Sequence, residues 1–178
     1  MDNSKLMASE KLTKEDVEKI KAEINERKSV LRPKILEDVK SARAQGDLSE
    51  NFEYYAARKM NRENNARISY LEKMLKDAII IETKSTSGVN LNNMVKVKFI
   101  EEGLDESAWE EETYKIVTSI RADSMKKKVS IESPLGKALI SHEIGEIVKV
   151  ELENGSGYEL KIIDIITNVE DDDELKAF

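Results

Sequence analysis

The residues best suited to chemistry are two carboxylates in the stretch Gly46-Asp47-Leu48-Ser49-Glu50-Asn51, which lies between two long helical patterns. Asp47 and Glu50 are three residues apart, and carboxylate oxygens are the ligands that a hard cation such as Mg²⁺ accepts. Two carboxylates fill only part of an octahedron. The stretch therefore predicts a partial Mg²⁺ site that a partner completes, and the free protein is expected to bind no metal tightly.

A second interpretation of the same acids stays open, which is that they cap a helix. Asp47 would be a good N-cap, and Glu50 at the third helical position would complete a capping box. Both would also suit the positive end of the helix dipole. Spacing alone favours capping over catalysis, but the roles are compatible because a cap fixes the direction of a carboxylate.

Two long helices are predicted to position these acids. Apolar side chains recur between residues 13 and 45 in steps of three, four and seven, which is the period of a coiled-coil seam. This first set is Val17, Ile20, Ile24, Leu31, Ile35, Val39 and Ala42. A second pattern of the same period runs from about residue 50 to residue 78. Its members are Ala57, Asn64, Ile68, Leu71, Leu75 and Ala78.

The turn at Gly46 is too short for anything but an antiparallel hairpin. Each arm of roughly 30 residues would be about 45 Å long. Thr13, with Asp16 three residues on, is expected to cap the first helix, and Pro33 is expected to kink it. The sequence thus places the two acids at the tip of a long rod.

The hydrophobic period changes after Ile81. Residues 83–93 are rich in Ser, Thr, Gly and Asn and are interpreted as a linker. Ser133-Pro134 predicts a helix start, followed by a short helix over 135–142, and Asn154-Gly155 predicts a hairpin turn. Alternating patterns predict five strands, at 94–99, 113–120, 128–132, 146–152 and 158–166.

These patterns predict an α+β protein with three parts. Residues 1–82 would form an antiparallel coiled-coil hairpin, residues 83–93 a linker, and residues 94–178 a small antiparallel α+β domain. Charged residues make up 37% of the 178 residues, against a usual quarter. A long hairpin exposed to water accounts for that excess.

Composition also excludes several classes of protein. The net charge is about +2 over residues 1–80 and −9 over residues 81–178, the total being −7, so a general nucleic-acid coat with a basic surplus is not expected. There is no cysteine, and His142 is the only histidine, which argues against thiolate or histidine metal clusters and against a Ser-His-Asp triad. No apolar run of membrane-spanning or signal-peptide length is found, so a soluble cytoplasmic protein is expected.

The stretch ARAQGDLSENFEYYAAR over residues 42–58 resembles the hairpin tip of the Gre family of transcript-cleavage factors, whose pattern is AR-x-x-GDL-x-EN-x-EY-x-AA. Arg32-Pro33 is similar to an Arg-Pro of the family's first helix. SPLGKALI over 133–140 is similar to the family's SP-x-A-x-AL-x-G segment, although Leu135-Gly136 stands where an alanine is expected. The resemblance covers nearly the whole chain, with hairpin and C-terminal domain in the same order.

The resemblance implies a fold and an activity. The C-terminal domain would be similar to FK506-binding proteins and would dock at the rim of the secondary channel of bacterial RNA polymerase. The hairpin would enter that channel, where Asp47 and Glu50 would help the polymerase hold its second Mg²⁺ and position a water. Backtracked RNA would then be cleaved by two-metal chemistry. The protein would be a monomeric accessory factor, not an enzyme.

Other side chains near the tip are candidate contacts for the 3′ end of backtracked RNA. Arg43, Arg58, Lys59 and Arg62 could pair with its phosphates, and the alternative for each is a solvated helix surface. Tyr54 could stack on a base, although packing between the helices is slightly favoured. The modest number of basic residues leans towards family members that release short RNA fragments.

Three rival functions remain. A Gre homologue that occupies the channel and inhibits transcription would differ at the tip, and the GDL-x-EN pattern argues against it. A prolyl isomerase would need a deep aromatic pocket, but the aromatic residues after position 80 are spread thinly: Phe99, Trp109, Tyr114, Tyr158 and Phe178. A structural coiled-coil adapter would be indifferent to mutation of the tip.

Overall fold

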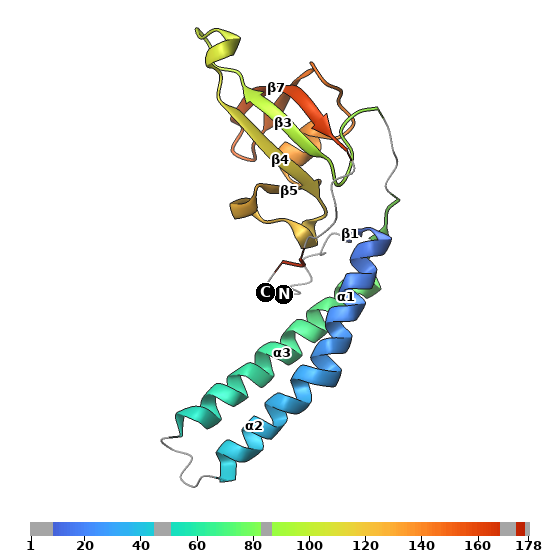
Figure 1. Ribbon diagram of the computed structural model, residues 1–178, viewed down its shortest axis with the longest axis vertical. Helices are drawn as coiled ribbons and strands as arrows, with labels where there is room; N and C mark the ends of the chain where they lie inside the picture. The colour runs from blue at the N-terminus through green and yellow to red at the C-terminus, as the bar shows by residue number, and fades with distance from the viewer. Residues whose placement is uncertain (1–8, 45–50, 83–86, 168–173, 177–178) are drawn as a thin grey trace, which may run out of the picture. The chain divides into compact units, whose positions relative to one another are not determined.

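The computed structural model describes residues 9–44, 51–82, 87–167 and 174–176 (Figure 1). The chain divides into two compact units, one ending at Ile80 and one beginning at Ile81. The predicted acids Asp47 and Glu50 lie outside the described residues.

The first unit is a hairpin of two long helical arms (Figure 1). The first arm comprises α1 (Lys14–Glu26), the π-helical segment η1 (Arg27–Leu31) and α2 (Arg32–Ala44). The second arm is α3 (Phe52–Asp77), which packs against all three segments of the first arm. The predicted helical hairpin is confirmed.

The seam between the arms follows the predicted period. Every predicted seam residue of the first arm is buried or half-buried, and the most buried are Ile20, Ile35 and Ala42. From α3 the buried side chains are Ala57, Asn64, Arg67, Ile68, Leu71 and Met74. The periodic pattern missed only Arg67 and Met74 among these, because an arginine is an uncommon seam residue and both stand one position from a seam residue.

The base of the hairpin is fixed by a cap and a small sheet. The predicted capping box is confirmed, since Thr13 Oγ1 accepts from the Asp16 N–H and an Asp16 carboxylate oxygen accepts from the Thr13 N–H at 2.9 Å. Just before it, β1 (Lys11–Leu12) pairs in parallel with β2 (Ile79–Ile80), and Leu12 is fully buried. The sequence did not predict this pairing, because two-residue strands carry no periodic signal.

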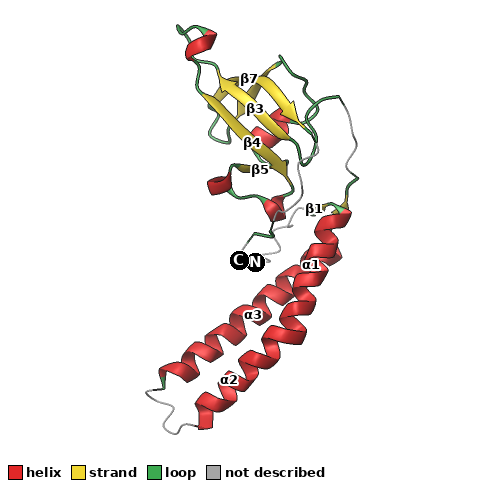
Figure 2. Cartoon of the chain, viewed as in Figure 1, coloured by secondary structure: helices red, strands yellow, loops and turns green. Residues whose placement is uncertain are grey.

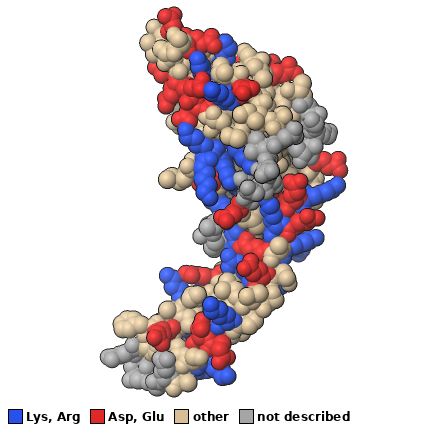
Figure 3. Space-filling model, viewed as in Figure 1, with Lys and Arg blue, Asp and Glu red and all other residues tan. Residues whose placement is uncertain are grey.

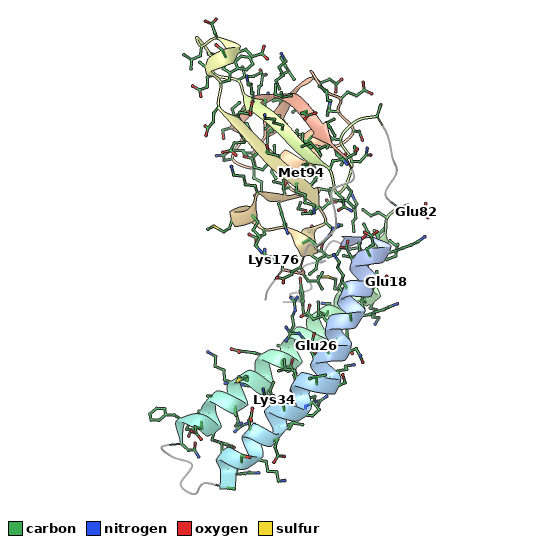
Figure 4. The ribbon with its side chains drawn as sticks, viewed as in Figure 1. Glu18, Glu26, Lys34, Glu82, Met94 and Lys176 are labelled. Atoms are coloured by element: carbon green, nitrogen blue, oxygen red, sulfur yellow. The ribbon has the colours of Figure 1, made fainter. Side chains whose placement is uncertain are left out.

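The segment η1 ends two residues before Pro33, where a kink was predicted. In η1 the turn is widened, and the Arg32 N–H donates to the carbonyl of Arg27, five residues back. A proline inside a helix lacks a donor and presses on the carbonyl four residues earlier. The wider turn stands at that place in the arm, between Glu26 and Lys34 (Figure 4).

Within its described residues, the second unit is a five-stranded sheet with one short α-helix (Figure 2). The order across the sheet is β5-β4-β3-β7-β6. The strands are β3 (Met94–Phe99), β4 (Glu111–Val117), β5 (Lys128–Ser130), β6 (Ile147–Glu151) and β7 (Gly157–Ile166), and the helix is α4 (Pro134–Leu139). The short 3₁₀ segments are η2 (Glu106–Ala108), η3 (Ser119–Arg121) and η4 (Ser124–Lys126).

The all-antiparallel sheet predicted from the sequence was wrong in one pairing. β3 is antiparallel to β4 and β7, and β6 is antiparallel to β7, but β4 and β5 run parallel. Residues 118–127 connect β4 to β5 and include η3 and η4. This connection brings the chain back to the level of Lys115 in β4, so that β5 runs in the same direction as β4. Strand signals in sequence do not report direction, so only this connection could have indicated a mixed sheet.

The predicted linker is also too long at its C-terminal end. Val89 and Leu91, assigned to it from their polar neighbours, are buried, and Val89 belongs to the core of the second unit. The Val89 N–H donates to the carbonyl of His142, and the Ser141 N–H donates to the carbonyl of Val89. Residues 87–93 are therefore part of this unit.

The fold class is α+β, as predicted. No helix among the described residues is long and apolar enough to cross a membrane.

Candidate functional site

The tip of the hairpin is closed by the side chain of Asn51. α2 ends at Ala44 and α3 begins at Phe52. Asn51 Oδ1 accepts from the Tyr54 N–H at 3.0 Å, and Asn51 Nδ2 donates to the carbonyl of Ala42 at 2.7 Å. One amide group thus caps the second arm and binds the end of the first.

This arrangement corrects the capping interpretation of the tip acids. The N-cap of α3 is Asn51, and α3 begins at Phe52 rather than near residue 50. The cap predicted at Asp47, with Glu50 at the third helical position, was therefore wrong for α3. The acid in the first turn of α3 is Glu53, which suits the positive end of the helix dipole.

The predicted basic contacts lie on either side of the tip and are exposed. Arg43 belongs to the last turn of α2, while Arg58, Lys59 and Arg62 belong to the first half of α3. Lys59 Nζ is 3.7 Å from a carboxylate oxygen of Glu63, and both side chains are more than half exposed. An exposed pair of this kind is weak, so Lys59 can exchange this partner for another anion.

Tyr54 is half-buried and has two close neighbours. Its ring meets the ring of Tyr55 edge-on, with centroids 5.8 Å apart, and the Arg58 guanidinium carbon lies 5.7 Å from its centroid. These contacts occupy the ring and hold Arg58 on the same side of α3. The structure thus brings together Tyr54 and Arg58 among the predicted residues.

Sequence reasoning missed three residues of the tip. It did not single out Asn51, although an asparagine directly before a helical pattern is a cap signal. It also passed over Phe52 and Tyr55, whose side chains are 86% and 55% exposed. Their signal was available in the sequence, as two aromatic residues spaced for one helix face beside a predicted turn.

A polar cluster joins the arms at mid-length. Arg67, only 4% exposed, donates to both carboxylate oxygens of Glu23, at 2.9 and 3.0 Å. Arg27 donates to Glu23 at 2.7 Å and to the side-chain oxygen of Asn64 at 3.2 Å. Burial acts to raise the pKa of Glu23, but the hydrogen bonds from Arg67 and Arg27 outweigh it and lower that pKa below its ordinary value.

Charge at the described tip is mixed. On the face shown in Figure 3, Lys and Arg side chains alternate with Asp and Glu along the lower end of the hairpin, with no large patch of one sign. Among the described residues, no group of three His, Cys, Asp or Glu side chains could hold a metal ion. The described tip thus offers aromatic rings and separate cations to a partner.

Comparison with known proteins gives matches along most of the chain. Residues 10–80 match the family described as "Transcription elongation factor, N-terminal", and residues 84–167 match "Transcription elongation factor, GreA/GreB, C-term". "Transcription elongation factor GreA" of Thermosipho africanus is 42% identical over 81% of this chain and 88% of that protein. The protein of the same name from Staphylococcus epidermidis is 40% identical over 86% of this chain and 94% of that protein.

Two solved structures are also similar to this chain over most of its length. GreA factor homolog 1 of Thermus thermophilus is 23% identical, with a TM-score of 0.41, and covers 89% of this chain and 99% of that chain. The elongation factor GreA/GreB of Nitrosomonas europaea is 16% identical, with a TM-score of 0.37, and covers 89% of this chain and 98% of that chain.

Proposed function

The chain belongs to the GreA/GreB family of transcription elongation factors, and on that basis we propose that it stimulates RNA polymerase to cleave backtracked RNA. It acts with RNA polymerase and so works inside the cell, in the cytoplasm. The protein itself is an accessory factor, and the polymerase carries the catalytic centre.

One observation carries this proposal. Both halves of the chain match the family in the same order, and the motif GDLSEN stands between the end of α2 and the start of α3. Asn51, the last residue of that motif, binds both arms and so fixes the ends of the turn that contains the acids. We therefore expect the motif at the end of a rod that can reach into a narrow channel.

The proposed chemistry needs the two tip acids. Carboxylates fit the oxygen preference of Mg²⁺, and two of them leave an octahedral ion incomplete, which agrees with an ion shared with the polymerase. When bound, such an ion would supply charge stabilisation for phosphodiester hydrolysis. Asp47 would bind such an ion, Glu50 would bind it or orient the attacking water, and the exposed cations of the tip would pair with the RNA 3′ end.

The two halves of the chain divide the work. Residues 1–82 form the arm that enters the secondary channel, and the second unit, residues 87–178, docks at its rim as a monomer. The separation of hydrophobic cores supports this, because the seam of the hairpin and the core around Val89 belong to different compact units. A fragment of residues 1–82 should stimulate cleavage only at high concentration, and the C-terminal fragment should not stimulate it.

A cleavage assay tests the proposal. Purified polymerase is stalled on a template with backtracked RNA, the protein is added with Mg²⁺, and the released RNA is sized. Release of short 3′-terminal fragments, followed by resumed elongation from the new 3′ end, is expected only when both proteins are present. RNA hydrolysis by the protein alone would contradict the accessory role, and inhibition without cleavage would identify a channel-blocking homologue instead.

A further inference from the structure

Two aromatic side chains at the start of α3 point into water. Phe52 is 86% exposed and Tyr55 is 55% exposed, and they are three residues apart on α3. Residues with that spacing share one face of a helix. Tyr54 lies on another face, half-buried, with its ring against Tyr55 and Arg58. Phe52 and Tyr55 therefore form an exposed pair, with the Tyr54 ring beside Tyr55.

Exposure of one apolar residue carries little information, because folded proteins expose many. The residues that surround this pair on α3 say more about what it could bind. Lys59 follows Tyr55 by four residues and Phe52 by seven, which places all three along one stripe of α3. The stripe combines rings that can stack with a cation held only by an exposed partner, Glu63. Stacking rings beside cations are how proteins bind single-stranded nucleic acid without reading its sequence.

We propose that Phe52 and Tyr55 form a stacking platform for unpaired bases of the extruded RNA, with Lys59 beside the adjoining phosphate. This inference rests on the proposed function, which brings backtracked RNA to the tip. Because every base has a flat face, the platform accepts any sequence. Its effect is to hold the RNA 3′ segment in place while the polymerase cleaves it, so Phe52 and Tyr55 are positioning residues.

Substitutions at Phe52 separate stacking from other roles. Phe52→Leu keeps most of the apolar surface but removes the flat ring, while Phe52→Trp keeps a stacking face. Phe52→Leu should lower stimulated cleavage by about tenfold, the effect typical of losing one base–aromatic stack, and Phe52→Trp should retain it. Val30→Ala is the matched control, because Val30 is 63% exposed on the first arm and away from the tip.

A second measurement uses RNA whose extruded nucleotides lack their bases. With this RNA the wild-type protein should fall to the rate seen with Phe52→Leu, and Phe52→Leu should lose nothing more, because the partner of the ring is already absent. Circular dichroism should show equal helical content and melting for all variants. A merely structural role of Phe52 would reduce cleavage of both RNAs equally.

The outcomes are distinguishable. If the wild-type protein stimulates cleavage and Phe52→Leu does so equally well, the platform is overturned while the proposed function stands. If Phe52→Ser is impaired but Phe52→Leu is not, the apolar side chain contacts a protein wall and not a base, which also overturns the platform. A wild-type protein that does not stimulate cleavage at all would overturn the proposed function and this inference together.

Discussion

The middle of the hairpin and its tip use polar and aromatic side chains in opposite ways. At mid-length, Glu23 is bound by two arginines from both arms, and the cations are satisfied within the protein. At the tip, Phe52 and Tyr55 are exposed, and Lys59 has only an exposed neighbour. The middle of the rod is thus built to keep its own shape, and the tip is built to contact something else.

This contrast predicts that substitutions at the tip change activity and that substitutions at mid-length change stability. The largest effect is expected for Asp47→Asn, because it removes a charge that a hard cation needs while keeping the size of the side chain. Stimulated cleavage should fall by about 100-fold or more. Binding to polymerase should persist, so the variant should compete with the wild-type protein.

An alanine substitution can serve as a control at Asp47. If Asp47 had capped α3, alanine would also have destabilised the helix. Since Asn51 caps α3, Asp47→Ala should reduce cleavage as strongly as Asp47→Asn and should leave the melting temperature of the hairpin unchanged. Glu50→Gln should behave similarly with a smaller loss. If Asp47→Asn stimulated cleavage as strongly as the wild-type protein, the Asp47 carboxylate would have no part in the mechanism.

The second-largest effect is expected at Asn51, where a substitution should change both the stability of the hairpin and the stimulated cleavage. Asn51→Ala removes both the cap and the bond to the Ala42 carbonyl, which should cost about 1–2 kcal/mol of stability. Stimulated cleavage should fall by about tenfold as the ends of the tip loosen. Asn51→Ser keeps a cap but cannot bridge the arms, so recovery of stability without recovery of cleavage would assign the loss to the bridge.

The third prediction concerns Glu23 and is a prediction of stability alone. Its pKa is lowered in the folded protein, so its contribution is complete above the unfolded pKa of about 4.3 and is lost as pH falls through the lower folded value. Glu23→Gln should therefore destabilise the hairpin by about 1–3 kcal/mol at neutral pH. The difference from the wild-type protein, followed by urea unfolding, should shrink below about pH 4.

Cleavage by folded Glu23→Gln should equal that of the wild-type protein. A large loss of cleavage without a loss of stability would show that the middle of the rod also acts on the partner, and the contrast between the two regions would fail.

The smallest effect is expected for an exposed pair across the same arms. Lys28 Nζ is 2.5 Å from a carboxylate oxygen of Glu72, but both side chains are about half exposed. Glu72→Gln should change the free energy of unfolding by no more than about 0.5 kcal/mol, and less in high salt. A loss comparable with that of Glu23→Gln, in matched urea titrations, would show that burial does not distinguish the two pairs.

Much of the hairpin could be predicted because its signals are local. Seam residues such as Ile20 and Ile35 recur at a fixed period, and Thr13 and Asp16 form a cap within one turn. The partners of Arg67 could not be predicted, because Glu23 lies 44 residues away and no local pattern joins them. The parallel pairing of β4 with β5 could not be predicted either, because strand patterns in sequence do not report strand direction.

The candidate site was predictable as a motif but not as a geometry. The carboxylates of Asp47 and Glu50 suited a hard cation, but their spacing alone favoured a capping box. The hydrogen bond from the Tyr54 N–H shows that Asn51 caps α3, and the metal role of the two acids stays a prediction. Likewise, Phe52 stands outside the predicted seam, but only the structure shows that its side chain is 86% exposed.

The π-helical segment before Pro33 has a consequence for how the rod keeps its length. The backbone of Leu12 pairs with that of Ile80 at the base of the hairpin, and Asn51 binds the carbonyl of Ala42 at the tip. Between them the first arm has one residue more than the second. A π turn is how a helix accommodates one extra residue, so η1 takes up the surplus and lets the two arms end level. The length of α3 therefore sets how far the tip extends from the base of the hairpin. The π turn lets the first arm, with its extra residue, match that length.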